Sequence, residues 1–318
     1  MKTYSTWIPN QPASKGATAY HDAVVNTSWH KENIRELIKI IRKKIKSDDV
    51  IVDFGAGTGT STIYLFKTFK DVKFLAVDKS ASWLTNAYEL LNKNKNVYFY
   101  LVKKKGNKFI RLDKLIGEKI ANHVLSFNTI HLISDIDETF KGIYASLKKG
   151  GIFSFQSGNI ILKKRENGIL MIDDSINAIH DLAIEIIYKD SRFKKYKNGL
   201  AKRIKEQAQQ RTTIFPNPRT LEFYIKVLKS VGFKNEKTYR KKIRIEYNDW
   251  LDFLRVKRLQ AGILPEVGGR YETREENIDR DVIITKASKE LFNILIKNNP
   301  LANSSSFFAE WVYVLAEK

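Results

Sequence analysis

The sequence predicts an α/β fold: a Rossmann-like doubly wound sheet that is mostly parallel, ends in an antiparallel last strand and carries helical lid insertions. Two observations lead to this prediction. The apolar, β-branched residues 50–52 end at an acidic residue, Asp53, and are followed by a glycine-rich turn and then by a helical pattern. Apolar segments of strand length then alternate with helical segments as far as residue 155. This alternation is typical of parallel sheets that bind ligands at the carboxyl ends of their strands.

The turn at residues 55–59 has glycine at its first, third and fifth positions and is the first candidate ligand site. Glycine allows a positive φ and lets a ligand approach the main chain closely. The helix that follows begins with free N–H groups and a partial positive charge. A dinucleotide fingerprint would need glycine at position 60, where Thr60 stands. The alternative is an ordinary glycine-rich turn without a ligand.

This turn, with Asp53 just before it, resembles the first motif of class I S-adenosylmethionine-dependent methyltransferases. The order and spacing of segments from Val50 to Gln156 agree with that family, including the Gly150-Gly151 turn before the fifth strand. The resemblance implies S-adenosylmethionine as cofactor and S-adenosylhomocysteine as product. The cofactor-binding residues that it implies are Asp53, Phe54, Gly55, Ala56, Gly57, Gly59, Asp78, Lys79, Trp83 and Asn128.

Two positions in this set carry specific expectations. Asp78 ends a short strand about 20 positions beyond the glycine turn, the usual distance to a ribose-binding carboxylate. Family members often have a large apolar residue at the position of Trp83, against the adenine ring; the alternative is that Trp83 belongs to the core.

After the third strand, 97–102, many members have an acidic residue near the adenine amino group, but this chain has three lysines. The adenine contact is therefore expected from the backbone, from Asn107, or not at all.

The catalytic candidates are His131, His21 and Tyr20. His131 follows the fourth strand, where similar enzymes often carry a histidine. A neutral imidazole there could accept a proton from an acceptor hydroxyl. The alternatives are that His131 packs among its apolar neighbours, that His21 is the base, or that a deprotonated nucleophile needs none. Asn128 would orient the substrate or the cofactor amine, because an amide cannot take the proton.

The chain is expected to form one methyltransferase domain over residues 1–318. Residues 1–28 have little periodicity and are either a cover over the cofactor or a loosely docked tail. Helices are expected at 32–45, 221–231, 247–258 and 283–297, a sixth strand at 236–245, and an antiparallel edge strand at 307–316. The expected parts are an N-terminal cover segment and helix (1–46), a cofactor-binding core (47–157), a helical lid insertion (158–216), and the rest of the core (217–318) with a second insertion at about 258–304.

Composition limits the class of protein. Hydrophobic residues make up 43% of the 318, as in globular proteins, and no apolar run approaches the roughly 20 residues that span a bilayer. The first residues lack the layout of a secretory signal. The absence of cysteine excludes disulfides, thiolate metal sites and cysteine nucleophiles, and no metal is expected. A cytoplasmic enzyme is the simplest interpretation.

The formal net charge of +21 has two explanations. One is a surface for nucleic acid or an anionic partner; the other is the lysine bias of an AT-rich genome, which suits lysines spread along the chain. No RNA-binding signature is found, and residues 215–218 have the residue types of the amide-methyltransferase motif in the wrong order. The sequence does not indicate an oligomeric state.

The lid-like insertions favour an enclosed pocket. The leading hypothesis is methyl transfer to an O, N or C nucleophile of a small molecule, as in specialised biosynthesis, without a membrane partner. The alternatives are an RNA-directed methyltransferase and a methyltransferase-like protein with a binding or cyclase role.

Overall fold

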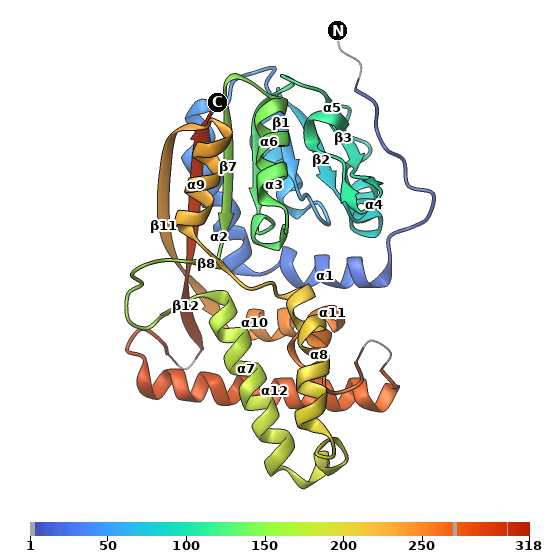
Figure 1. The fold of residues 1–318 in the computed structure, drawn as a ribbon, viewed down its shortest axis with the longest axis vertical. Coiled ribbons are helices and arrows are strands. Elements are labelled where there is room, and N and C mark those ends of the chain that lie inside the picture. Colours follow the sequence, from blue (N-terminus) through green and yellow to red (C-terminus); the bar gives the residue numbers. More distant parts are fainter. Residues whose placement is uncertain (1–3, 270–271, 304) are drawn as a thin grey trace.

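The computed structural model describes residues 4–269, 272–303 and 305–318. Its main sheet has the strand order β11-β12-β7-β6-β1-β2-β3 (Figure 1). The five strands from β7 to β3 are parallel to one another, and β12 is antiparallel to both of its neighbours. The bounds are β1 Val50–Phe54, β2 Lys73–Asp78, β3 Val97–Leu101, β6 Ala121–Phe127, β7 Leu147–Ser157, β11 Lys234–Glu246 and β12 Ser306–Glu317. The predicted fold class is confirmed, including the antiparallel last strand.

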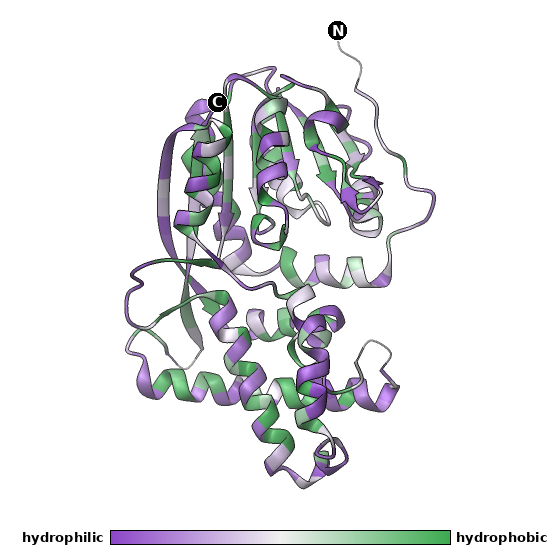
Figure 2. Cartoon of the chain, viewed as in Figure 1, coloured by the Kyte–Doolittle hydropathy of each residue, from purple (hydrophilic) through white to green (hydrophobic). Residues whose placement is uncertain are grey.

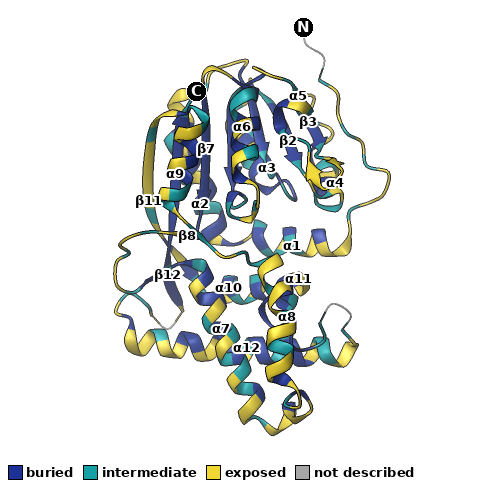
Figure 3. Cartoon of the chain, in the orientation of Figure 1, coloured by how far each residue is buried: buried dark blue, intermediate teal, exposed yellow. Residues whose placement is uncertain are grey.

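One detail of the predicted sheet is wrong. The last strand was expected at an edge, but β12 lies between β7 and β11, and β11 is the edge. Burial explains the order, because β12 is an almost unbroken apolar run buried on both faces. By contrast, β11 is largely exposed (Figure 3) and mostly hydrophilic (Figure 2). Its many lysines and arginines discourage pairing with another chain.

Helices cover both faces of the sheet. On one face lie α2 (Ser28–Ile41), α3 (Thr60–Thr68) and α4 (Ala81–Leu91); on the other lie α5 (Leu112–Ile116), α6 (Ile136–Ser146) and α9 (Leu221–Val231). Side chains alternate between the two layers, since Ile51 joins the first hydrophobic cluster while Val50 and Val52 join the second. The middle strands are buried by these layers (Figure 3).

Further helices lie together beyond the carboxyl ends of the strands (Figure 1). They are α7 (Ile172–Lys189), α8 (Leu200–Ile214), α10 (Tyr247–Leu254), α11 (Lys257–Ile263) and α12 (Arg274–Asn298). We refer to them as the helical part. One hydrophobic cluster continues from Ile34 on α2 through Trp250 to Ile283 on α12. The helical part therefore shares a core with the sheet.

The boundaries of several helices differ from the expected ones. Helix α2 lies four residues earlier than the expected 32–45, and the helix expected at 247–258 is divided into α10 and α11. Helix α12 begins well before residue 283, because Thr273 and Glu276 form a capping box at its start. Residues 15–25 form a helix, α1 (Lys15–Val25), that weak periodicity did not reveal. It buries three side chains, Ala17, His21 and Val24, too few for a clear apolar stripe.

The segment before α1 is fixed along the edge of the sheet. The Trp7 N–H donates to the Phe99 carbonyl of β3 at 2.7 Å. Helix α1 then runs between the sheet and the helical part (Figure 1). The smaller elements are β4 (Lys104–Lys105), β5 (Lys108–Phe109), β8 (Ile160–Ile161), β9 (Ile169–Leu170), β10 (Arg219–Thr220) and 3₁₀ turns at Arg42–Lys44, Ile130–Leu132 and Ser191–Tyr196. In the described ranges, no helix has the length and apolar character needed to cross a membrane.

Candidate functional site

A cavity of about 700 Å³ opens between the carboxyl ends of the parallel strands and the helical part. It lies where β1 is flanked by β2 on one side and β6 on the other. In doubly wound folds the strand order reverses at such a point, and the reversal leaves a crevice in which ligands bind. The volume falls within the range of about 300–1,000 Å³ that is usual for small-molecule sites.

The glycine turn forms one wall of this cavity. Gly55 and Gly57 line it, with φ of 80° and 55°. Glycine adopts these left-handed conformations without the steric cost that a side chain would add. A Cβ on Gly55 would lie only 2.2 Å from Cγ2 of Thr129. The Gly55 and Ala56 N–H groups donate to the Val77 carbonyl at 2.8 and 3.0 Å, which fixes the turn on β2.

Asp78 joins the turn to the end of β2. Its Oδ2 accepts from the Gly57 N–H at 2.9 Å, and its Oδ1 accepts from the Ser80 N–H at 2.7 Å. Burial raises the pKa of Asp78, although these hydrogen bonds oppose the shift. Each carboxylate oxygen keeps a lone pair for a ligand hydroxyl, so the geometry suits the predicted ribose contact.

Asp53 and Gly59 do not line the cavity, although both were expected to contact the cofactor. Asp53 is fully buried behind the turn, where its Oδ2 accepts from the hydroxyls of Ser61 and Thr62 at 2.7 and 2.6 Å. Burial raises the pKa of Asp53 to about 6. At Gly59 a Cβ would lie 2.8 Å from Cβ of Ala87 on α4. The two residues hold α3 and α4 in place beneath the turn.

Trp83 lines the cavity and is not a core residue. Its ring lies 4.5 Å from that of Tyr20 on α1, and the Arg258 guanidinium lies 5.0 Å from its centroid. Asn107 and Phe109, beyond β3, also line the cavity. These residues surround the expected adenine site, and their contacts with adenine stay predictions.

Of the three catalytic candidates, His131 and Tyr20 line the cavity and His21 does not. Burial, with Arg219 nearby, lowers the pKa of His131 to about 4, and so the imidazole is neutral at pH 7. Burial raises the pKa of Tyr20 to about 12, which keeps the phenol protonated. The roles of His131 and Tyr20 in catalysis stay predictions.

His21 is buried behind the glycine turn. Its Nδ1 lies 3.2 Å from Oγ1 of Thr58 and 3.3 Å from Oγ1 of Thr60. Both threonines line the cavity, while the imidazole lies behind them. This placement suits a residue that supports the turn, rather than one that contacts an acceptor.

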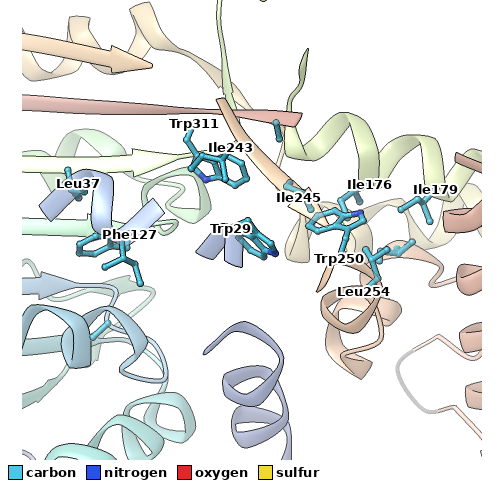
Figure 4. Close-up of a cluster of buried hydrophobic side chains, with 14 of the residues drawn as sticks. Trp29, Leu37, Phe127, Ile176, Ile179, Ile243, Ile245, Trp250, Leu254 and Trp311 are labelled. Atoms are coloured by element: carbon cyan, nitrogen blue, oxygen red, sulfur yellow. The ribbon is translucent and has the colours of Figure 1, made fainter. Parts of the chain in front are cut away.

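The far side of the cavity holds aromatic side chains that the sequence did not single out as a group. Trp29 lies between Trp311 and Trp250 (Figure 4), with ring centroids 5.9 and 6.2 Å away. The Phe253 ring centroid lies 5.5 Å from that of Trp29. We name these four residues the aromatic wall. His30 lies beside Trp29 and lines the cavity, and burial lowers its pKa to about 4. The wall joins α2, α10 and β12, so no local motif indicates it.

Comparisons with known proteins agree with this geometry. Residues 52–153 match a family model described as a methyltransferase domain. The chain is 30% identical over 220 residues to a carboxy-S-adenosyl-L-methionine synthase of Nautilia profundicola, covering 67% of this chain and 82% of that relative.

Solved structures show the same fold. A phosphoethanolamine N-methyltransferase 2 of Haemonchus contortus, solved with S-adenosyl-L-methionine, aligns with a TM-score of 0.53 at 17% identity, over 95% of this chain and 56% of that one. The cyclase SpnF aligns with a TM-score of 0.52 at 11% identity, over 96% and 98%. At these identities the likeness shows the fold alone.

Proposed function

The chain belongs to the class I S-adenosylmethionine-dependent methyltransferase family, and from this premise we propose that it transfers the methyl group to a small molecule held inside the cavity. The observation that carries the proposal is the continuity of the cavity from the glycine turn to the aromatic wall. Its volume suits a cofactor with a small acceptor beside it. The covering helices leave less room for a folded RNA than for a small molecule.

The residues present fit S-adenosylmethionine, which supplies an activated methyl group when bound. Gly55 and Gly57 allow the close approach of a ligand, and Asp78 offers carboxylate lone pairs beside them. Trp83 and Tyr20 provide aromatic surface at the same end. Because the methyl group is already activated, the chain mainly has to orient the acceptor, and orientation can contribute about 7–11 kcal/mol.

The test follows the methyl group. The protein is incubated with methyl-labelled S-adenosylmethionine and an extract of small metabolites, and products are separated by mass. We expect the label in a low-mass compound, with S-adenosylhomocysteine as the nucleoside product. Label that appears only in RNA or protein would contradict the proposal. The Gly57→Arg variant in the same extract controls for transfer that does not depend on this site.

A second candidate function is modification of the cofactor itself. The relative from Nautilia profundicola is named for making carboxy-S-adenosyl-L-methionine, and the chain covers 82% of it. The same experiment separates the two reactions. Methyl transfer yields S-adenosylhomocysteine, whereas the second reaction yields a sulfonium nucleoside that is heavier by a carboxyl group.

The position of His21 predicts a supporting role. Replacing His21 by leucine removes its hydrogen bonds to Thr58 and Thr60 in the wall of the cofactor site. A neutral hydrogen bond contributes about 1 kcal/mol, so we expect the affinity for S-adenosylhomocysteine to fall about fivefold. Calorimetric titration measures this. An unchanged affinity in a folded variant would show that His21 does not support the turn.

A further inference from the structure

Three side chains line the cavity where it meets the aromatic wall: Asn128, His131 and Asn159. We name them the donor cluster. They lie at the carboxyl ends of β6 and β7. Gly158 places this end against the wall, because a Cβ there would lie 2.9 Å from Cε2 of Trp311. The hydrogen-bonding direction of each member is set by a neighbour.

The two amides are oriented by groups that can only donate. The Trp311 indole N–H donates to Oδ1 of Asn128 at 3.2 Å, and the Asp173 backbone N–H donates to Oδ1 of Asn159 at 3.0 Å. Since both oxygens are accepting, the amino groups of Asn128 and Asn159 are on the other side. Among the described residues neither amino group has a partner.

His131 is oriented by Ser157. The Ser157 Oγ accepts from the Asn159 N–H at 2.9 Å and lies 2.9 Å from Nδ1 of His131. No other partner of this hydroxyl is found in the described part of the chain, so its proton is best placed on a bond to Nδ1. Nδ1 is then the acceptor, and the proton of the neutral ring is on Nε2. In this tautomer His131 presents a donor.

The carboxylates that line the cavity are engaged by other groups and do not accept hydrogen bonds from the donor cluster. In the described ranges they are Asp78, Asp135 and Glu138. Asp78 accepts two backbone N–H bonds, Asp135 accepts one at the start of α6, and Glu138 pairs with Arg111 and Lys141. A ligand that reaches the donor cluster therefore meets N–H groups and no free carboxylate among these residues.

We propose that the acceptor is a small, planar, largely apolar molecule that carries an oxyanion, bound by the donor cluster with its apolar body against the aromatic wall. This rests on the proposed function, because it names the acceptor class for the same cavity. Hydrogen bonds to a charged oxygen are stronger than those to a neutral one. An oxyanion is also attracted to the positive sulfonium of the methyl donor. The rival is an ammonium group, since aromatic faces attract cations.

Three compounds of similar shape separate these classes: benzoate, benzamide and benzylammonium. Each is titrated into the complex with S-adenosylhomocysteine, which carries no sulfonium, so the preference reports the protein alone. Quenching of tryptophan fluorescence provides the signal, because three of the five tryptophans are in the wall. We expect benzoate to bind about tenfold more tightly than benzylammonium, with benzamide between them. Equal or tighter binding of benzylammonium, or no benzoate binding up to about 10 mM, would overturn the proposal.

Asn159→Asp tests the donor cluster directly, because it replaces an amino group by a carboxylate oxygen. We expect it to lose the preference for benzoate. Asn198→Asp is the matched control, since Asn198 is exposed in the turn before α8 and the same change there should leave the preference intact. Loss of the preference in Asn198→Asp as well would overturn the assignment. Binding of S-adenosylhomocysteine is measured in each protein. If the parent does not bind it, the proposed function fails; if the parent binds it without preferring benzoate, this inference alone fails.

The tautomer of His131 can be measured in the parent protein. This readout therefore does not depend on whether a variant of the donor cluster folds. Long-range ¹H–¹⁵N spectra distinguish protonated from unprotonated ring nitrogens, and His131 is one of five histidines. We expect Nε2 to carry the proton in the cofactor-product complex, and Ser157→Ala to weaken that bias. A proton on Nδ1 in the parent protein would show that His131 is not a donor to the cavity.

Discussion

Replacing Gly57 by arginine should abolish measurable binding of S-adenosylmethionine while the fold is retained. The residue lines the cavity at φ 55°, and a Cβ there would touch the Trp83 ring at an ordinary 3.4 Å. The backbone can therefore accept the side chain at a cost of about 1–2 kcal/mol. The rest of the arginine would occupy ligand space. We expect a loss of at least about hundredfold in affinity, or about 3 kcal/mol.

Gly150→Arg is the matched control for this variant. Gly150 also has a positive φ, 72°, but a Cβ there would meet no atom within 4 Å, and it precedes the buried part of β7 at the opposite end of the sheet. The two variants share the backbone strain and the added charge. Calorimetry should show full affinity in Gly150→Arg and none in Gly57→Arg. Similar affinity in both folded variants would mean that Gly57 does not face the cofactor.

The cofactor half of the site was predictable because its information is local. A strand, a glycine turn and a helix are adjacent in the sequence, and the spacing to Asp78 follows from one βαβ unit. Eight of the ten expected cofactor residues line the cavity. Asp53 and Gly59 do not, because a local pattern shows the type of turn but not which side of it each side chain faces.

The half of the cavity that we propose for the acceptor was not predictable in the same way. Trp29, Trp250 and Trp311 come from three segments far apart in the chain, and the sequence around each one does not indicate the other two. Their meeting depends on how α10 and β12 pack on α2, which is a tertiary property. The same holds for Asn159, whose orientation is set by the backbone of Asp173.

The sheet order shows both what the pattern could predict and where it fell short. The apolar run at residues 307–316, which only Glu310 interrupts, contains the signal for a strand buried on both faces, and β11, with its charged residues, contains the signal for an edge. The order of the segments along the chain suggested instead that the last strand forms the edge. Helix α1 was missed because its helical periodicity is weak.

The buried carboxyl group of Asp53 predicts a pH-dependent stability that Asp53→Asn should remove. Burial raises its pKa to about 6 in the folded protein, from 3.8. Between these values the folded state binds more protons than the unfolded state, so stability falls as pH rises through the folded pKa. From about pH 4 to about pH 8 the parent should lose roughly 2 kcal/mol through this group. The asparagine variant lacks this loss, so its free energy of unfolding relative to the parent should rise by that amount.

Urea unfolding of the unliganded proteins at the two pH values measures the difference. Other buried groups, such as Asp173 and His131, titrate in both proteins and cancel when the variant is compared with the parent. Asn at this position can still accept from Ser61 and Thr62, and its amino group takes the place of Oδ1, which has no partner among the described atoms. Asp252→Asn is the control, because it makes the same change of side chain at an exposed position. If the two variants behave alike, Asp53 is ionised in the folded protein at little cost. Its hydrogen bonds from α3 would then outweigh the burial that raises its pKa.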